Sequence, residues 1–317
     1  MTINVLGYAA HSPKTDLEPY RFDRRNPRPD DVVIDILYCG VCHTDIHLVR
    51  DDWSNSTFPV VPGHEITGRV KSVGPDVTRF KPGDHVGVGL IIDSCQHCSA
   101  CKQGLEQYCE EGPTYTFNSL DRHDRMLTFG GYSENIIVSE KFVIRISDGL
   151  DLKGAAPLLC AGVTTWSPLP HWKIKQGANV GVVGLGGVGH MAIKLAKGIG
   201  ANVTLFTHSP GKEQDAHRLG ADNVVISTNA EQMASINNKF DLIIDTVPNT
   251  HDVNPYLPTL SLNGTLVMVG FFGNLEPTMN TSPLERRRRS VAGSIIGGIA
   301  ETQELRFLCK AWYYCRC

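Results

Sequence analysis

The second half of the chain alternates short apolar strands with helical segments, and this rhythm constrains the fold more than any other feature. Asn179–Val183 is a short buried strand, and apolar residues from Val188 to Ile199 then recur at helical spacing. Further strands are expected at Val203–Phe206, Val224–Ser227, Leu242–Thr246, Thr265–Val269 and Val291–Ile296. Strands joined by such crossovers are typical of an α/β fold with a doubly wound parallel sheet.

The part of the chain before residue 160 has a different pattern, of short β segments separated by turns rich in Gly and Pro. Val32–Tyr38 alternates apolar and polar residues, and Ile66–Val73, His85–Leu90 and Asn135–Ile146 are similar. A chain of 317 residues is also long for one hydrophobic core. We therefore expect two domains, of which the first is rich in β structure.

Composition and charge exclude several classes of function. The formal net charge is -3, with both signs spread along the chain, so neither nucleic acid nor a membrane surface is an expected partner. No apolar run reaches the roughly 20 residues of a membrane span, and Met1–Asn4 does not open a signal peptide. We expect a cytoplasmic protein. Disulfides are rare there, so the 10 cysteines call for metal binding or catalysis.

Four cysteines lie close together in the pattern C-x2-C-x2-C-x7-C, namely Cys95, Cys98, Cys101 and Cys109. Four thiolates complete a tetrahedral shell around zinc and leave no position for water, which predicts a structural zinc site. An iron–sulfur cluster uses similar spacings and is the main alternative. No proline follows the last cysteine and no second cluster motif is present, which favours zinc.

A glycine-rich segment predicts a nucleotide site. Its residues Gly184, Leu185, Gly186, Gly187, Val188 and Gly189 follow a strand and open a helix, where backbone N–H groups can receive a pyrophosphate. The next strand ends without the acid that holds the ribose 2′-hydroxyl of NAD. It is followed instead by Thr207, His208, Ser209 and Lys212, which can bind a 2′-phosphate, so we expect NADP(H).

Cys42, His64 and Cys160 are candidate ligands of a second metal, although their spacing alone does not link them. Their contexts do. The segments GVCHTDIH, PGHEITGRV, LCAGVTTW and GLGGVGH, with the four-cysteine loop, IIDTV and GSIIGG, occur in the order seen in zinc-containing medium-chain alcohol dehydrogenases. The chain most resembles the branch of the cinnamyl-alcohol dehydrogenases and NADP(H) aldehyde reductases, over about residues 5 to 305.

This resemblance implies a second zinc ion, held by Cys42, His64 and Cys160 with one position open to substrate. It also implies that Glu65 can approach this metal, and that Asp45 and Glu65 support its ligands. A proton relay is implied from the hydroxyl of Thr44 through the cofactor ribose to His47.

The resemblance further implies a GroES-like catalytic domain over residues 1–160, to which residues 298–317 return, and an NADP(H)-binding Rossmann domain over residues 161–297. Two subunits would pair through GSIIGG-like edge strands into a homodimer. Further cofactor contacts carried over by motif are Thr164, Thr246, Gly270, Ser294, Ile295 and Ile296. Ile295 and Ile296, with Trp53 and Phe272, are also candidates for the substrate end of the site.

The expected activity is the interconversion of primary alcohols and aldehydes by a zinc- and NADP(H)-dependent enzyme. A polyol or secondary-alcohol dehydrogenase of the same superfamily is the alternative, but its cofactor strand would more often end in an acid.

After Leu305 the sequence departs from the pattern of this family and ends at Cys317. We interpret this ending as truncated or frameshifted, and expect it to expose β edges and apolar surface. An inactive zinc-binding remnant is therefore a further alternative. Cys315 and Cys317 in this segment are interpreted as chance cysteines.

Overall fold

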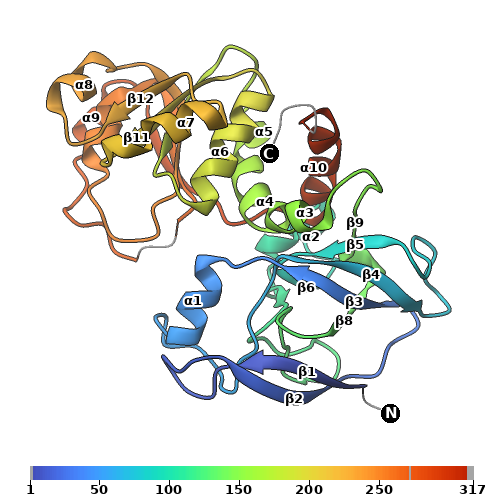
Figure 1. Cartoon of the computed structure of the whole chain (residues 1–317). Coiled ribbons are helices and arrows are strands. Elements are labelled where there is room, and N and C mark those ends of the chain that lie inside the picture. The colour runs from blue at the N-terminus through green and yellow to red at the C-terminus, as the bar shows by residue number, and fades with distance from the viewer. Residues whose placement is uncertain (1–2, 271–272, 313–317) are drawn as a thin grey trace. The chain divides into compact units, whose positions relative to one another are not determined.

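The computed structural model describes residues 3–270 and 273–312, with side chains up to residue 305. The chain divides into two compact units, residues 1–160 with 297–317 and residues 161–296 (Figure 1). The second crossing between the units lies one residue before the expected boundary at 297/298. Phe272, Cys315 and Cys317 lie outside the described residues.

The first unit is built on a five-stranded sheet in the order β8-β3-β4-β5-β9, in which all neighbours are antiparallel. Its strands are β3 (Asp31–Cys39), β4 (Ile66–Val73), β5 (His85–Val88), β8 (Asn135–Ser139) and β9 (Ile144–Arg145). Their buried faces carry β-branched and other apolar residues such as Ile34, Ile66 and Ile136, which suit a pleated half-buried surface. The expected β-rich, GroES-like domain is confirmed.

One predicted strand of this unit was wrong. We expected a single strand over Asn135–Ile146, but β8 and β9 lie at opposite edges of the sheet. A 3-10 turn over Glu140–Phe142 separates them, and the Ser139 hydroxyl accepts a hydrogen bond from the Lys141 N–H at its start. Glu140 accepts hydrogen bonds from the backbone of Thr78 and Arg79. The apolar pattern runs through the turn because Phe142 is buried too.

The first unit contains further strands, helices and 3-10 turns. They are β1 (Ile3–Ala9) and β2 (Glu18–Arg24), β6 (Ile91–Asp93) and β7 (Thr114–Tyr115), the helices α1 (His43–Arg50), α2 (Ser99–Lys102), α3 (Leu152–Ala155) and α10 (Ile299–Trp312), and the 3-10 turns η1 (Glu106–Tyr108), η2 (Glu140–Phe142) and η3 (Ala156–Leu159). The metal-ligand candidates lie on the loops and helix ends between these elements.

The segment that returns to the first unit is anchored by specific contacts. Ile299 donates its backbone N–H to the Glu106 carboxylate (3.0 Å) at the start of α10, the red helix in Figure 1. The side-chain amide of Gln303 pairs with both the N–H and the carbonyl of Arg145, at 3.0 and 3.1 Å. Since Arg145 lies on the edge strand β9, this amide covers backbone groups that the sheet leaves open.

The second unit holds a six-stranded sheet in the order β12-β11-β10-β13-β14-β15, in which all neighbours are parallel. Its strands are β10 (Asn179–Val183), β11 (Asn202–Thr207), β12 (Asn223–Ile226), β13 (Phe240–Asp245), β14 (Leu260–Met268) and β15 (Ser290–Gly293). This is the doubly wound order, which reverses between β10 and β13, and the fold class is confirmed.

Helices α4 (Ala161–Trp166) and α5 (Pro168–His171) precede this sheet in the chain, and the later helices and turns connect its strands. These later elements are α6 (Gly187–Gly198), α7 (Glu213–Leu219), α8 (Ala230–Ser235) and α9 (Ser282–Glu285), with the 3-10 turns η4 (Pro210–Lys212) and η5 (Asn254–Thr259). In Figure 1, α6 and α7 lie side by side next to β11 and β12. In the core, the ring of Phe206 meets those of Phe240 and Tyr256 edge to face. Among the described helices, none is long and apolar enough to cross a membrane.

Candidate functional site

The four-cysteine loop gathers its sulfur atoms into one cluster. The sulfurs of Cys95, Cys98, Cys101 and Cys109 all lie within 4.8 Å of one another. Backbone N–H groups point at three of them: Cys95 N at Cys109, Cys98 N at Cys95 and Cys101 N at Cys98, at 3.3 to 3.4 Å. The sequence does this locally, because α2 begins at Cys98 and turns the chain between successive sulfurs.

These contacts favour a thiolate at Cys98, whereas desolvation raises the pKa of Cys95 and raises that of Cys101 to about 12. Hydrogen bonds from the backbone N–H groups of Cys101 and Glu110 lower the pKa of Cys98 to about 6. Four sulfurs without a nitrogen or oxygen ligand are a donor set that fits a closed zinc site.

A second cluster brings together residues far apart in the sequence. Cys42, His64 and Cys160 have their ligand atoms within 4.8 Å of one another. The two sulfurs are 3.9 Å apart, and His64 Nε2 lies 3.2 Å from the sulfur of Cys160. All belong to the first unit. Two thiols and one imidazole are the donor set of a zinc site that keeps a coordination position open.

Each ligand of this cluster lies at the end of an element. Cys42 is the N-cap of α1, and Cys160 directly follows η3. His64 follows Gly63, whose φ is +105°. A Cβ at Gly63 would lie 2.8 Å from the backbone N of Tyr132, so only glycine fits this turn.

Asp45 ties the segment of Cys42 to that of His64. Its Oδ1 accepts from His64 Nδ1 (3.0 Å) and from the Gly63 N–H (2.8 Å), and its Oδ2 accepts from the Cys42 N–H (2.9 Å). Asp45 and His64 are both buried, at 2% and 0% exposure. The carboxylate therefore fixes the His64 tautomer with Nε2 free to face the sulfurs.

Without a metal, electrostatics in this cluster make Cys42 the thiolate, while the hydrogen bond with Cys42 and burial raise the pKa of Cys160 well above its usual value, so a metal would displace protons from Cys160 and His64. Hydrogen bonds with Cys160 and His64 lower the pKa of Cys42 to about 4, although burial opposes this shift. Burial also lowers the pKa of His64, but the negative charges of Asp45 and Cys42 outweigh it and raise that pKa to about 10. A thiolate is the form of cysteine that binds metal.

Thr44, His47 and Trp53 were also predicted to belong to this site, and each has different neighbours. Thr44 Oγ1 lies 3.7 Å from the sulfur of Cys42. His47 Nδ1 lies 2.8 Å from Asp52 Oδ2, and its buried Nε2 has no hydrogen-bond partner among the described residues. Trp53, a candidate for the substrate end, packs its ring 5.2 Å from that of His47.

Glu65 is not among the clustered ligand atoms. It is buried, and its carboxylate packs so closely on Gly40 that a Cβ there would lie 2.0 Å from Oε2. Its approach to a metal stays a prediction.

Two residues that support this cluster were not anticipated. The Tyr132 hydroxyl lies 3.4 Å from Asp45 Oδ2, at the end of a turn that packs on Pro62 and Gly63. Arg24 holds that turn, because its guanidinium donates to the carbonyls of Phe129 and Gly130 (2.7 and 3.0 Å). A buried arginine is uncommon, but no sequence motif links Arg24 to the metal ligands.

The glycine-rich turn has the form expected of a nucleotide site. Gly184 has φ of +88°, and a Cβ at Gly189 would lie 2.1 Å from the carbonyl of Gly184. Around Gly186 and Gly187, in contrast, no atom lies within 4 Å of a Cβ position, so this surface is open. Leu185 and Val188 complete the turn, and α6 begins without a side-chain cap on its N–H groups. This is the arrangement that receives a phosphate.

The residues after β11 lie beside this turn. Lys212 Nζ donates to the carbonyl of Leu185 (2.9 Å), which brings its ammonium to the glycine-rich turn. His208 is exposed and Ser209 partly so, whereas the Thr207 hydroxyl is buried and accepts from the Ser209 N–H (3.1 Å). A positive side chain thus connects the segment after β11, where we expect the 2′-phosphate, with the glycine-rich turn, where we expect the pyrophosphate.

Most other predicted cofactor residues follow parallel strands, so they lie at the same end of the sheet, where the carboxyl ends of its strands meet. Thr246 follows β13, Gly270 lies just beyond β14, and Ser294, exposed Ile295 and buried Ile296 follow β15. Strand β15 ends at Gly293, three residues earlier than we expected. Thr164 follows no strand and lies on α4.

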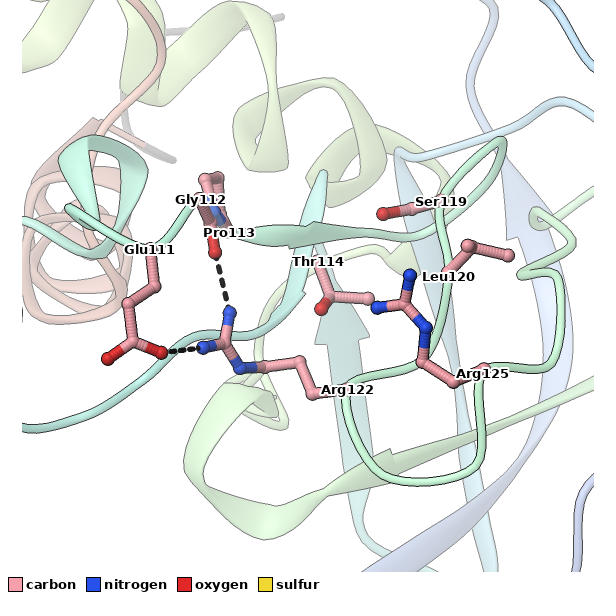
Figure 2. Close-up of a pocket in the computed structure, with 8 residues that line it drawn as sticks. All are labelled: Glu111, Gly112, Pro113, Thr114, Ser119, Leu120, Arg122 and Arg125. Atoms are coloured by element: carbon pink, nitrogen blue, oxygen red, sulfur yellow. Dashed lines mark hydrogen bonds and ion pairs between the residues drawn. The ribbon is translucent and has the colours of Figure 1, made fainter.

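The first unit also contains a polar cavity of about 380 Å³ beside the zinc loop, lined by Glu111, Gly112, Pro113, Thr114, Ser119, Leu120, Arg122 and Arg125. Figure 2 shows the Arg122 guanidinium donating to the Glu111 carboxylate and the Gly112 carbonyl. None of the lining residues belongs to the Cys42–His64–Cys160 cluster.

Comparison with known proteins bears on this site. Residues 28–148 match the model of the alcohol dehydrogenase GroES-like domain, and residues 187–310 match that of the zinc-binding dehydrogenases. The chain is 48% identical to aldehyde reductase YahK of Escherichia coli over 310 residues, which is 98% of this chain and 88% of that protein.

Solved structures agree. A cinnamyl alcohol dehydrogenase from Sorghum bicolor superposes with a TM-score of 0.94 at 42% identity, covering 98% of this chain and 88% of that one. The cinnamyl alcohol dehydrogenase of Helicobacter pylori complexed with NADP(H) gives 0.90 at 41% identity, covering 97% and 88%. The predicted class, an oxidoreductase that uses zinc and NADP(H), is confirmed. With both family models matched, this chain belongs to the zinc-binding alcohol dehydrogenases, in the branch of the aldehyde reductases and cinnamyl alcohol dehydrogenases.

Proposed function

We propose that this chain reduces aldehydes to primary alcohols with NADPH and catalyses the reverse oxidation with NADP⁺. The observation that carries the proposal is the buried cluster of Cys42, His64 and Cys160, in which a carboxylate orients the histidine. Cys95, Cys98, Cys101 and Cys109 would hold a second, structural zinc.

When bound, zinc held by Cys42, His64 and Cys160 supplies Lewis-acid polarisation of a carbonyl, and NADPH supplies a hydride. The protein's own residues prepare the site. Cys42 and Cys160 would bind the metal as thiolates, and Asp45 holds His64 with Nε2 directed at them. The glycine-rich turn and Lys212 would bind the phosphates of the cofactor.

A proton must also be exchanged with solvent. The Thr44 hydroxyl lies beside the metal ligand Cys42 and can pass a proton to or from substrate. His47 has a ring nitrogen with no partner among the described residues, while Asp52 fixes the other one. The open nitrogen could accept a proton that arrives through the cofactor ribose.

Metal analysis and turnover test the proposal together. We expect two zinc ions per chain and NADPH-dependent reduction of aromatic and aliphatic aldehydes. Relatives named as probable mannitol dehydrogenases, such as one from Medicago sativa that is 45% identical, make mannitol oxidation the matched comparison. A higher kcat/KM for mannitol than for primary alcohols, or a preference for NADH, would contradict it.

We further propose that the protein is a cytoplasmic homodimer. Strand β15 lies at the edge of its sheet, bonded to β14 on one side only, so a second copy could extend the sheet there. Light scattering after size exclusion should give twice the chain mass, and a monomer at micromolar concentration would contradict the pairing. Fractionation of source cells would test the compartment.

A further inference from the structure

The loop that follows β13 contains an ion pair between a buried carboxylate and a partly exposed histidine that the chemistry above does not use. Asp245, the last residue of β13, has no exposed surface, and its Oδ2 lies 2.8 Å from Nε2 of His251. The other ring nitrogen, Nδ1, lies 2.8 Å from the backbone carbonyl of Asn249. The ring thus bridges the end of the strand and the far side of the loop.

Both partners of the ring are hydrogen-bond acceptors. A carbonyl oxygen and an ionised carboxylate cannot donate, so His251 satisfies both only when both of its nitrogens carry a proton. The hydrogen bond to Asp245 also raises the pKa of His251, more than burial lowers it. The imidazolium therefore makes two hydrogen bonds, of which a neutral ring could keep only one. We call these two hydrogen bonds, to Asp245 and to the Asn249 carbonyl, the clasp.

The clasped loop packs on the glycine-rich turn. Asp245 Oδ1 accepts from the Val247 N–H (3.1 Å), and the Thr246 hydroxyl donates to the carbonyl of Val183 (2.8 Å). A Cβ at Gly184 would lie 3.2 Å from both Thr246 Oγ1 and Val247 Cγ2. A change in the backbone of this loop would therefore be transmitted directly to the turn.

This loop also lies where the strand order reverses, between β10 and β13. In doubly wound sheets that point is where the nucleotide binds. From this placement we propose that His251, held as an imidazolium on Asp245, is a positioning residue for the NADP(H) site: it keeps the loop over residues 246–250 in the form that supports the glycine-rich turn.

The proposal predicts a pH dependence with a definite sign. Because the pKa of His251 is raised in the folded protein, the clasp is complete below the ordinary histidine value of about 6.5. It is lost as pH rises through the raised folded value. The other titratable groups that act here are Asp252, whose charge also favours the imidazolium, and Tyr256, which lies near both carboxylates.

The test is direct NADPH binding to the full-length chain, measured by fluorescence titration between pH 6.5 and 9. His251→Gln carries its donor hydrogens on one nitrogen and cannot bridge the two partners as the two ring nitrogens do, so its Kd should exceed that of the wild type by about tenfold at pH 6.5. The ratio should fall toward one at pH 9, where the wild-type ring is also neutral. KM for NADPH should follow, while kcat at saturating NADPH stays within about threefold. A structural defect would give a ratio that does not vary with pH.

A second variant and a control distinguish the loss of these hydrogen bonds from a loss of folding. His251→Arg keeps a positive charge at every pH, so its Kd should lack the rise toward pH 9. His217→Gln is the matched control, because His217 also donates Nδ1 to a carbonyl (2.9 Å, Ala221) but lies on α7 away from the clasp. If His251→Gln does not fold, ring-nitrogen NMR of the wild type decides: a neutral His251 ring at pH 6.5 would overturn the inference.

The inference rests on the proposed cofactor site, and the two can fail separately. A wild-type chain that does not bind NADPH at all overturns both. NADPH binding with an unchanged or pH-independent Kd ratio overturns only the role of His251.

Discussion

The two clusters of metal ligands in the first unit are built in different ways. The four cysteines of the zinc loop come from residues 95–109, and backbone N–H groups of the same loop point at their sulfurs. Cys42, His64 and Cys160 come from distant segments, and the side chain of Asp45 joins two of these segments. A loop can form the first cluster by itself, whereas the second requires a folded domain. We therefore expect substitutions in the second to affect chemistry and those in the first to affect stability.

The largest effect is expected from removing a ligand of the dispersed cluster. Cys42→Ser should lower kcat/KM for aldehyde reduction by about 10³-fold, since Lewis-acid polarisation contributes several kcal/mol to the barrier. The zinc content should fall from two ions to one. Cys39→Ser is the matched control, because this nearby thiol is not in the cluster. Full activity in Cys42→Ser would remove the distinction between the two clusters.

A smaller loss is expected when the ligand is kept and its support is changed. Asp45→Asn removes the charge that orients His64, and such changes typically cost 10- to 100-fold in metal affinity or activity. Zinc titration with a competing chelator measures it. Asp35→Asn should have no effect, because Asp35 is half exposed and pairs only with Lys71 among the described ion pairs. Equal losses in both variants would contradict the assigned support.

A third substitution asks whether cofactor recognition is separate from both clusters. Lys212→Ala should raise KM for NADPH by about tenfold, because a charge-assisted contact with the 2′-phosphate is lost. KM for NADH should change little, and the zinc content should not change. Lys197→Ala is the control, since this lysine pairs with Asp222 instead. An equal rise for both cofactors would show that Lys212 only braces Leu185.

The same contrast explains how much could be predicted from the sequence. Strands β4 and β10 match their predicted bounds, because β4 alternates apolar and polar residues and β10 is a short apolar segment, each between clear turn signals. The four-cysteine loop was predicted from spacing alone, since its ligands are neighbours in sequence. Cys42, His64 and Cys160 needed the resemblance to a family, because no local pattern links residues that only the fold brings together.

The contacts that were not predicted join residues that are not neighbours in the sequence. The clasp between Asp245 and His251, the Tyr132 hydroxyl near Asp45, and the pairing of Gln303 with Arg145 join different elements or opposite ends of a loop. Each depends on a backbone direction that periodicity does not give. The error over Asn135–Ile146 has a similar origin, because the buried Phe142 continues the apolar pattern through a turn.

The smallest effect on chemistry is expected from the zinc loop itself. Cys98→Ser leaves three sulfurs, so the structural zinc should be lost while Cys42, His64 and Cys160 keep theirs. Loss of a structural metal removes its contribution to folding, and a decrease in Tm of about 5–10 °C is expected for a domain of this size. The loop also bonds to the returning segment, through Glu106 and the Ile299 N–H, so the loss of stability should include α10.

Hydrogen exchange and thermal melts with and without a chelator measure this effect. Exchange should rise in residues 95–109 and at the start of α10, while kcat of the folded fraction stays within about threefold. Ser99→Ala, next to the ligand and on the exposed side of α2, is the control and should leave Tm unchanged. If Cys98→Ser instead loses turnover at an unchanged Tm, the loop takes part in the chemistry. Closure by four thiolates would then not mark a purely structural site in this protein.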